Sequence, residues 1–208
     1  MNEFLEYLNT SVSLLGLPTS LLEILGFITG TVCIWLNTRQ NVWGWFFSIV
    51  NAVLYGGVFW QARLYADASL QVYFFLTSIY GGYMWLYGSS NQQPIPVTLT
   101  PPRLYPIFAV IFVLVTILWG YLLYNYTDAS LSYPSSALTV LSLIGQFMLA
   151  RKYLENWLLW IVANVGYVGM FAYKGLYLTS ILYFIFFILA IIGYITWQKD
   201  YKRNIKAD

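Results

Sequence analysis

The sequence contains no histidine and only one cysteine, Cys33. Without histidine the chain cannot form a Ser-His-Asp triad or a histidine metal site, and one cysteine cannot form an internal disulfide. No glycine-rich loop is followed by Lys-Ser or Lys-Thr, which excludes P-loop nucleotide hydrolysis. We therefore expect no metal and no cofactor, and we expect that the protein is not an enzyme.

Charged residues are also scarce. They make up 9% of the chain, whereas hydrophobic residues make up 60%. A soluble domain carries about 25% charged residues, so lipid is the expected solvent and partner of this chain. The net charge is +2 and the basic residues form no stripe that could neutralise phosphates, so no nucleic-acid partner is expected. Aromatic residues reach 20%, which predicts rings at membrane interfaces or around a cavity.

Seven apolar runs have the length that a transmembrane helix needs, about 17 to 25 residues. They cover residues 20–36, 42–61, 66–87, 105–124, 134–150, 156–173 and 177–197. The breaks between the runs hold nearly all of the charge and turn residues. The sequence therefore predicts an all-α integral membrane protein with seven transmembrane helices.

An internal repeat organises these spans. A shift of 112 residues aligns positions 39–85 with positions 151–197 without a gap, and it matches Trp, Gly and Leu-Tyr landmarks. The pairs include Trp45 with Trp157, Tyr55 with Tyr167, Gly57 with Gly169, Leu64-Tyr65 with Leu176-Tyr177, Gly81 with Gly193 and Trp85 with Trp197. Equivalent spans are four helices apart, so both repeats cross the membrane in the same direction. Parallel repeats of this kind occur among transporters, with the substrate site between them near the middle of the membrane.

The repeat defines the expected segments. They are an interfacial N-terminal segment over 1–19, a first three-helix repeat over 20–87, a cytoplasmic connection over 88–104, a linking helix over 105–124, a second three-helix repeat over 134–197 and a cytoplasmic tail over 198–208. The connection is polar and contains proline, a composition typical of a flexible linker.

The distribution of Lys and Arg predicts the orientation, because cytoplasmic loops carry the excess of both. A cytoplasmic C-terminus leaves only Arg63 and Lys174 outside, and the opposite orientation inverts this bias. We therefore expect a multi-pass protein of the bacterial inner membrane with a periplasmic N-terminus.

Buried polar side chains are the candidates for binding a polar solute at membrane depth. Trp157, Trp160 and Asn164 have the spacing i, i+3 and i+7, which places two indoles and an amide on one helical face. Such a face could hold a flat ring and its polar substituents. The alternative is interfacial anchoring by the indoles and a helix-to-helix hydrogen bond by the amide.

Further candidates are less specific. Trp45 and Asn51 occupy related places in the first repeat, and Gln71 and Gln146 lie well inside apolar runs. The remaining ring candidates are Tyr80, Trp85, Tyr167 and Tyr183. Each amide could bind a hydroxyl- or amide-bearing solute or could join two helices.

Acidic residues within the apolar runs are limited to helix ends. Glu23, Asp67 and Glu155 all lie close to the edge of a predicted span. A carrier driven by protons or sodium usually needs an ionisable or densely coordinating site near the middle of the membrane. The sequence therefore favours passive facilitation.

Two segments resemble the signature of the PnuC family of vitamin transporters. One comprises 151–160 (RKYLENWLLW), Asn164 and 174–177 (KGLY), and the other comprises 61–71 (QARLYADASLQ), 78–81 and Trp85. This resemblance implies a SWEET-like fold and facilitated diffusion of nicotinamide riboside, which a cytoplasmic kinase phosphorylates and traps for NAD biosynthesis. It also implies that the family's Trp-x-x-Trp-x-x-x-Asn motif, here Trp157, Trp160 and Asn164, holds the substrate.

The choice of vitamin stays open at this point. Some relatives of the family take thiamine and others riboflavin. Nicotinamide riboside and thiamine both present an aromatic cation, which a tryptophan face attracts by about 0.5–2 kcal/mol, whereas riboflavin is neutral and larger. A non-transporting receptor or a membrane enzyme are the alternatives of another class, and a homo-oligomer is compatible with the sequence.

Overall fold

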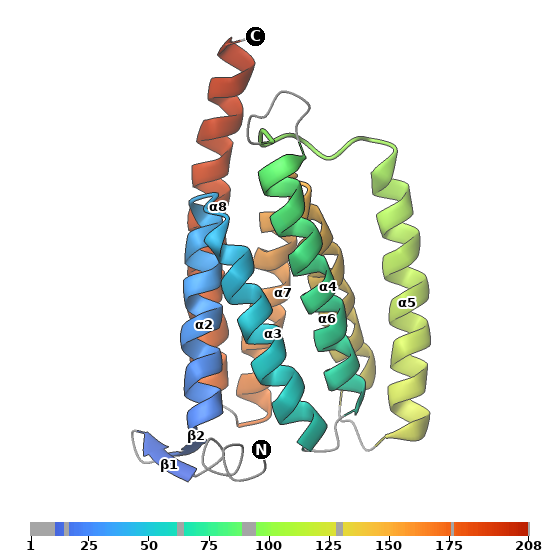
Figure 1. Cartoon of the computed structure of the whole chain (residues 1–208). Helices are drawn as coiled ribbons and strands as arrows, with labels where there is room; N and C mark the ends of the chain where they lie inside the picture. Colours follow the sequence, from blue (N-terminus) through green and yellow to red (C-terminus); the bar gives the residue numbers. More distant parts are fainter. Residues whose placement is uncertain are drawn as a thin grey trace. The chain divides into compact units, whose positions relative to one another are not determined.

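The computed structural model describes residues 11–14, 17–61, 65–88, 95–127, 131–175 and 177–207. Seven α-helices run in chain order from blue to red in Figure 1. They are α2 (Leu21–Thr38), α3 (Trp43–Gln61), α4 (Tyr65–Tyr87), α5 (Leu104–Tyr126), α6 (Ser132–Ala150), α7 (Asn156–Tyr173) and α8 (Tyr177–Ala207). Each predicted span falls on one of these helices, which confirms the all-α architecture.

Two terminal features differ from the expected segments. The region predicted as interfacial includes a small antiparallel hairpin of β1 (Ser11–Leu14) and β2 (Leu17–Ser20). At the other end, α8 continues as a helix to Ala207, beyond the span predicted to end at residue 197. The extension is rich in Lys and Arg, which favour helices, and Arg203 pairs with Asp200 at 3.5 Å.

The helices differ in length and in apolar composition. By length and composition, three helices in the described part of the chain are apolar enough to cross a membrane, namely Leu104–Tyr126, Ser132–Ala150 and Thr179–Ile205, and Ile24–Thr38 is apolar but shorter. Helices α3, α4 and α7 carry more glycine, tyrosine and amide residues. These three helices hold most of the candidate site residues.

The chain forms two compact units, residues 1–82 and 83–208, and the same turn geometry recurs in each. Between α2 and α3, Gln40 has a left-handed backbone with φ 54°, and between α6 and α7 its equivalent Lys152 has φ 53°. In both turns this residue donates its N–H to the carbonyl three residues earlier, at 3.0 Å. The shift of 112 residues therefore describes a repeated structure as well as a repeated sequence.

A tryptophan packed on a glycine also recurs. In the first unit the Trp45 indole lies against Gly81, and in the second unit the Trp157 indole lies against Gly193. Trp45 and Trp157 are almost completely buried. A side chain at either glycine would collide with the ring, so the matched glycines allow α4 and α8 to approach the helix that carries the indole.

The core of the second unit lies between α5 and α6. Buried Val140, Ile144, Met148 and Tyr153 pack with the partly buried side chains of Leu104, Phe108, Phe112, Val115 and Leu159. Phe108 meets Phe147 edge to face, with ring centroids 6.2 Å apart. The predicted linking helix is thus packed on the first helix of the second repeat.

Residues 95–103, which we call the strap, are held to the turn between α6 and α7. The Thr98 N–H donates to the Lys152 carbonyl at 3.1 Å, and the Leu154 N–H donates to the Thr98 carbonyl at 2.9 Å. The Glu155 carboxylate accepts from the backbone N–H of Thr100 at 2.9 Å and from its hydroxyl at 2.8 Å. This half of the connection is therefore not a flexible linker, and residues 89–94 lie outside the described residues.

Candidate functional site

The candidate site begins at the amino-terminal end of α7 with Trp157. Its ring is 2% exposed and meets Trp197 of α8 edge to face, with centroids 5.4 Å apart. Among the described residues, its indole N–H has no hydrogen-bond partner. Trp157 is therefore a packing residue between α7 and α8 with one unused donor.

Trp160 lies one turn further along α7 and is half-buried. Its indole covers Gly145 of α6, where a Cβ would lie 3.3 Å from the indole Nε1 and 3.4 Å from Cε2. Because position 145 has no side chain, the ring lies directly over the helix backbone. The indole keeps one part in contact with α6 and another part accessible.

Two buried carboxamides belong to the same pair of helices. Asn164 on α7 is 3% exposed and Gln146 on α6 is 6% exposed. In the described part of the chain neither side chain has a hydrogen-bond partner. Each amide offers both a donor and an acceptor, so water or a polar ligand can bind these groups. The sequence selected both residues, and the structure supplies the reason to retain them.

Tyr167 and Tyr183 form part of a stack of rings between α7 and α8. Their centroids are 4.6 Å apart, and Phe171 stacks on Tyr183 at 5.2 Å. The sequence predicted the two tyrosines as ring candidates but not Phe171. Its position four residues after Tyr167, on the same helical face, is the signal that could have found it.

The first-repeat candidates have clear packing partners. The Asn51 amide donates to the Gly26 carbonyl at 2.8 Å and to the Thr29 hydroxyl at 2.9 Å. Trp45 fills the space over Gly81, and the Gln71 side chain runs past Gly56. Asn51 therefore joins α3 to α2, which is the helix-joining alternative that the sequence left open.

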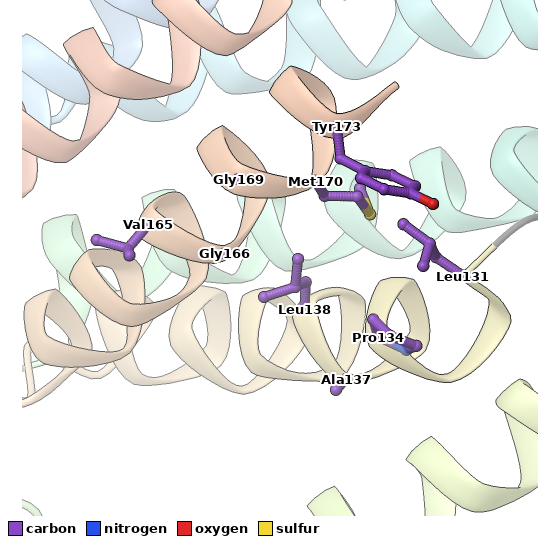
Figure 2. Close-up of a pocket in the computed structure, with 9 residues that line it drawn as sticks. All are labelled: Leu131, Pro134, Ala137, Leu138, Val165, Gly166, Gly169, Met170 and Tyr173. Carbon is purple, nitrogen blue, oxygen red and sulfur yellow. The ribbon is translucent and has the colours of Figure 1, made fainter. Parts of the chain in front are cut away.

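A cavity of about 480 Å³ lies beside α6 and α7, towards the end of the pair where α6 begins and α7 ends. Figure 2 shows its lining residues, which are Leu131, Pro134, Ala137, Leu138, Val165, Gly166, Gly169, Met170 and Tyr173. All except Tyr173 have apolar or no side chains. The cavity contains none of the predicted polar residues, so it does not coincide with the Trp160 and Asn164 site.

A buried cation marks the other end of the second unit. The Lys152 ammonium lies 4.7 Å from the centre of the Trp85 ring, and the Trp85 N–H donates to the Leu149 carbonyl at 3.3 Å. Burial lowers the pKa of Lys152 to about 8, and the Asp200 carboxylate acts against this shift. Trp85, proposed as a lining residue, is buried against Trp197 with centroids 5.9 Å apart.

Comparison with known proteins decides the family. The family model described as "Nicotinamide mononucleotide transporter" matches residues 20–199. The nicotinamide riboside transporter PnuC of Escherichia coli (strain K12) is 31% identical over 214 residues, 91% of this chain and 90% of that protein. The chain belongs to the PnuC family. It is therefore a transporter and not an enzyme, as the sequence predicted.

Other PnuC relatives agree. The nicotinamide riboside transporter PnuC of Haemophilus influenzae is 24% identical over 192 residues, 90% of this chain and 83% of that protein. The crystal structure of the vitamin B3 transporter PnuC matches with a TM-score of 0.68 at 22% identity, over 88% of this chain and 82% of that one. The PnuC fold, the multi-pass membrane location and the transport of a small vitamin substrate follow from these matches.

Proposed function

We propose that this PnuC protein transports nicotinamide riboside across the bacterial inner membrane. The relatives that carry this activity in their names cover nine-tenths of the chain. The observation that carries the proposal concerns three side chains on α6 and α7. The half-buried Trp160 ring lies on the same pair of helices as the buried residues Asn164 and Gln146, whose amides make no hydrogen bond within the described part of the chain. A pyridinium ring suits the indole face, and ribose hydroxyls suit the amides.

The riboside suits this chain better than the mononucleotide in the description of the family model. A phosphate carries about −1.5 to −2 charge at neutral pH and requires cationic partners. The Lys and Arg residues of this chain lie in the connections and at helix ends, not in the middle of the apolar runs. A cationic, unphosphorylated nucleoside needs only aromatic faces and amides. The charge distribution thus favours a dephosphorylated substrate.

Transport is passive in this proposal, and phosphorylation by a cytoplasmic kinase retains the product. Acidic residues in the spans are confined to helix ends, which leaves no charged group for an ion to bind in the middle of the membrane. A phosphorylated nucleoside is an anion that the same aromatic site no longer binds well. Trapping therefore supplies a direction that the transporter itself lacks.

Calorimetric binding to the purified protein tests the site. Trp160→Ala should weaken nicotinamide riboside binding by about tenfold to a hundredfold, because stacking and cation–π attraction are lost together. Asn164→Leu should also weaken binding while the protein stays folded, because the amide makes no hydrogen bond within the described protein. Unchanged affinity in both variants would place the site elsewhere.

Two matched controls separate binding from folding. Trp43→Ala removes an exposed indole from the first repeat and should leave affinity unchanged. Asn51→Leu removes the amide that joins α3 to α2 and should lower thermal stability more than affinity. Thiamine is titrated in parallel, and tighter binding of thiamine than of nicotinamide riboside would assign the chain to thiamine transport.

A further inference from the structure

The two repeats fill equivalent positions in opposite ways. In the second repeat, position 145 is a glycine and position 160 is a tryptophan whose ring lies over it. The equivalent positions of the first repeat are Cys33 and Ser48, 112 residues earlier. The Cys33 sulfur accepts from the Asn37 amide at 3.5 Å, and the Ser48 hydroxyl lies 2.7 Å from the Ser78 hydroxyl. The first repeat thus has two small side chains, Cys33 and Ser48, where the second repeat has a glycine, Gly145, covered by the Trp160 ring.

The contact between Gly145 and Trp160 is close enough to fix the ring. A Cβ at Gly145 would lie 3.3 Å from the indole Nε1, 3.4 Å from Cε2 and 3.7 Å from Leu159 Cβ. Any side chain at this position therefore has to displace the indole, because Gly145 itself is buried in the middle of α6. A Cβ at position 145 would therefore require the indole to shift by a few tenths of an ångström.

We infer that Gly145 is a positioning residue that sets the depth and orientation of the Trp160 ring, and thereby the affinity for the vitamin. This inference rests on the proposed function, because it gives Trp160 the role of the substrate-binding ring. Gly145 itself touches no substrate. Its effect passes through the indole, and a shift of a few tenths of an ångström at the ring edge changes how the ring face meets a flat ligand.

The orientation of the Trp160 ring also determines where its indole N–H lies. Nε1 is the indole atom closest to the Gly145 position, and among the described residues it has no hydrogen-bond partner. A side chain at position 145 would crowd this donor first. Both the stacking face and the donor of Trp160 therefore depend on the same missing Cβ.

The test is a series at Gly145, measured as nicotinamide riboside binding to the full-length protein. Gly145→Ala should weaken binding by about threefold and Gly145→Val by about tenfold or more, as part and then most of the ring interaction is lost. The melting temperature of Gly145→Ala should be unchanged or raised, because alanine favours a helix interior over glycine. Gly145→Ala thus keeps the test valid if Gly145→Val fails to fold.

The matched control is Gly169→Ala, another helix-interior glycine of the second repeat. A Cβ at Gly169 would meet nothing within 4 Å. We expect this variant to bind nicotinamide riboside like the wild type and to gain the same helix propensity. A loss of affinity only at Gly145 separates the indole contact from a general effect of replacing glycine.

A double-mutant cycle decides whether Gly145 acts through Trp160. Trp160→Phe retains part of the binding and lacks the five-membered ring that crowds position 145. In that background Gly145→Val should cost less than about twofold in affinity. A full tenfold loss in both backgrounds, or no loss in either, would overturn the inference.

The results also separate this inference from the proposed function. If Trp160→Ala binds like the wild type, the proposed site fails and the positioning role fails with it. If Trp160→Ala loses affinity while both Gly145 variants bind normally, only the positioning role is overturned.

Discussion

A lysine buried among aromatic rings is the most unusual single residue of the second unit. Lys152 is 3% exposed, and its ammonium faces the Trp85 ring at 4.7 Å. Lys152 has a left-handed backbone conformation, and its carbonyl accepts a hydrogen bond from the Thr98 N–H of the strap. The ring and the Asp200 carboxylate stabilise the charge that burial disfavours. The result is a lysine pKa of about 8, so the titration of Lys152 falls in a pH range where protein stability can be measured.

This pKa predicts a rise in stability with pH. The unfolded chain keeps the lysine protonated up to 10.5, whereas the folded protein releases the proton near 8. Between these values the unfolded state binds more protons, so the free energy of unfolding increases with pH by about 3 kcal/mol. Melting temperatures of wild type and Lys152→Met from pH 7 to 10 measure it. The variant should lack this part of the rise, and identical pH profiles would contradict the assignment.

The repeated tryptophan and glycine pairs predict a matched pair of destabilising substitutions. A Cβ at Gly193 would lie 2.6 Å from two atoms of the buried Trp157 ring, and a Cβ at Gly81 would collide with Trp45 in the same way. Gly81→Ala and Gly193→Ala should each cost about 1–3 kcal/mol of stability. Gly57→Ala and Gly169→Ala are the repeat-matched controls, because a Cβ at either site meets nothing within 4 Å. Thermal melts that rank all four variants alike would contradict the packing.

At the scale of elements, hydrogen bonds hold the strap to the turn between α6 and α7. The Glu155 carboxylate accepts three hydrogen bonds, two from Thr100 and one from the Tyr105 hydroxyl at 3.0 Å. Thr100 and Val97 are almost completely buried. Position 43, the repeat equivalent of Glu155, holds a tryptophan, so this carboxylate anchor belongs to the second repeat.

Removal of the carboxylate should release the strap. Glu155→Ala leaves the Thr100 donors unpaired and should cost about 1–3 kcal/mol. Hydrogen exchange of the Thr98 and Leu154 amides should accelerate, because both amides donate across the strap and turn. Tyr105→Phe removes one of the three bonds and should show a smaller effect. Exchange rates equal to the wild type in both variants would show that the backbone pairing holds the strap without Glu155.

The sequence predicted the elements better than it predicted the use of their polar residues. Hydrophobic run lengths placed all seven helices, since lipid leaves a spanning backbone few other ways to satisfy its hydrogen bonds. Asn51 and Asn164 looked alike in sequence, but the Asn51 amide donates across to the Gly26 carbonyl of α2, and within the described part of the chain Asn164 makes no such bond. Whether a buried amide finds a partner depends on the opposite helix, which spacing within one helix does not reveal.

The strap was missed for a different reason. Proline and polar residues outweighed the run Val97-Thr98-Leu99-Thr100, three of whose residues are β-branched, a composition typical of a strand. That run forms the parallel bridge between Thr98 and Tyr153. The overall composition of the connection predicted a flexible linker, but the four residues 97–100 determine the structure of its second half.

For the whole molecule, the absence of acidic residues away from helix ends predicts how transport is driven. In sealed proteoliposomes, nicotinamide riboside should reach equal concentrations inside and outside and go no further. An encapsulated kinase with ATP should raise the total internal label well above this level. Uphill accumulation without the kinase, under an imposed proton or sodium gradient, would contradict passive transport.

The bias of Lys and Arg predicts the orientation of the whole chain. In a Cys33→Ala background, a cysteine placed in the 88–102 connection should resist impermeant thiol reagents in intact cells. A cysteine placed near Asp128 should react with them. The reverse labelling pattern would invert the orientation of every span.

The contrast between Cys33 with Ser48 and Gly145 with Trp160 carries a consequence for how the chain diversified. A duplicated unit begins with two equal copies, and each copy can then lose what the other retains. In this chain the first repeat has the small side chains of Cys33 and Ser48 at these positions, and the second has the Trp160 ring over the Gly145 backbone. A saturation-mutagenesis map should therefore show tolerance for small replacements at positions 33 and 48 and intolerance at 145 and 160.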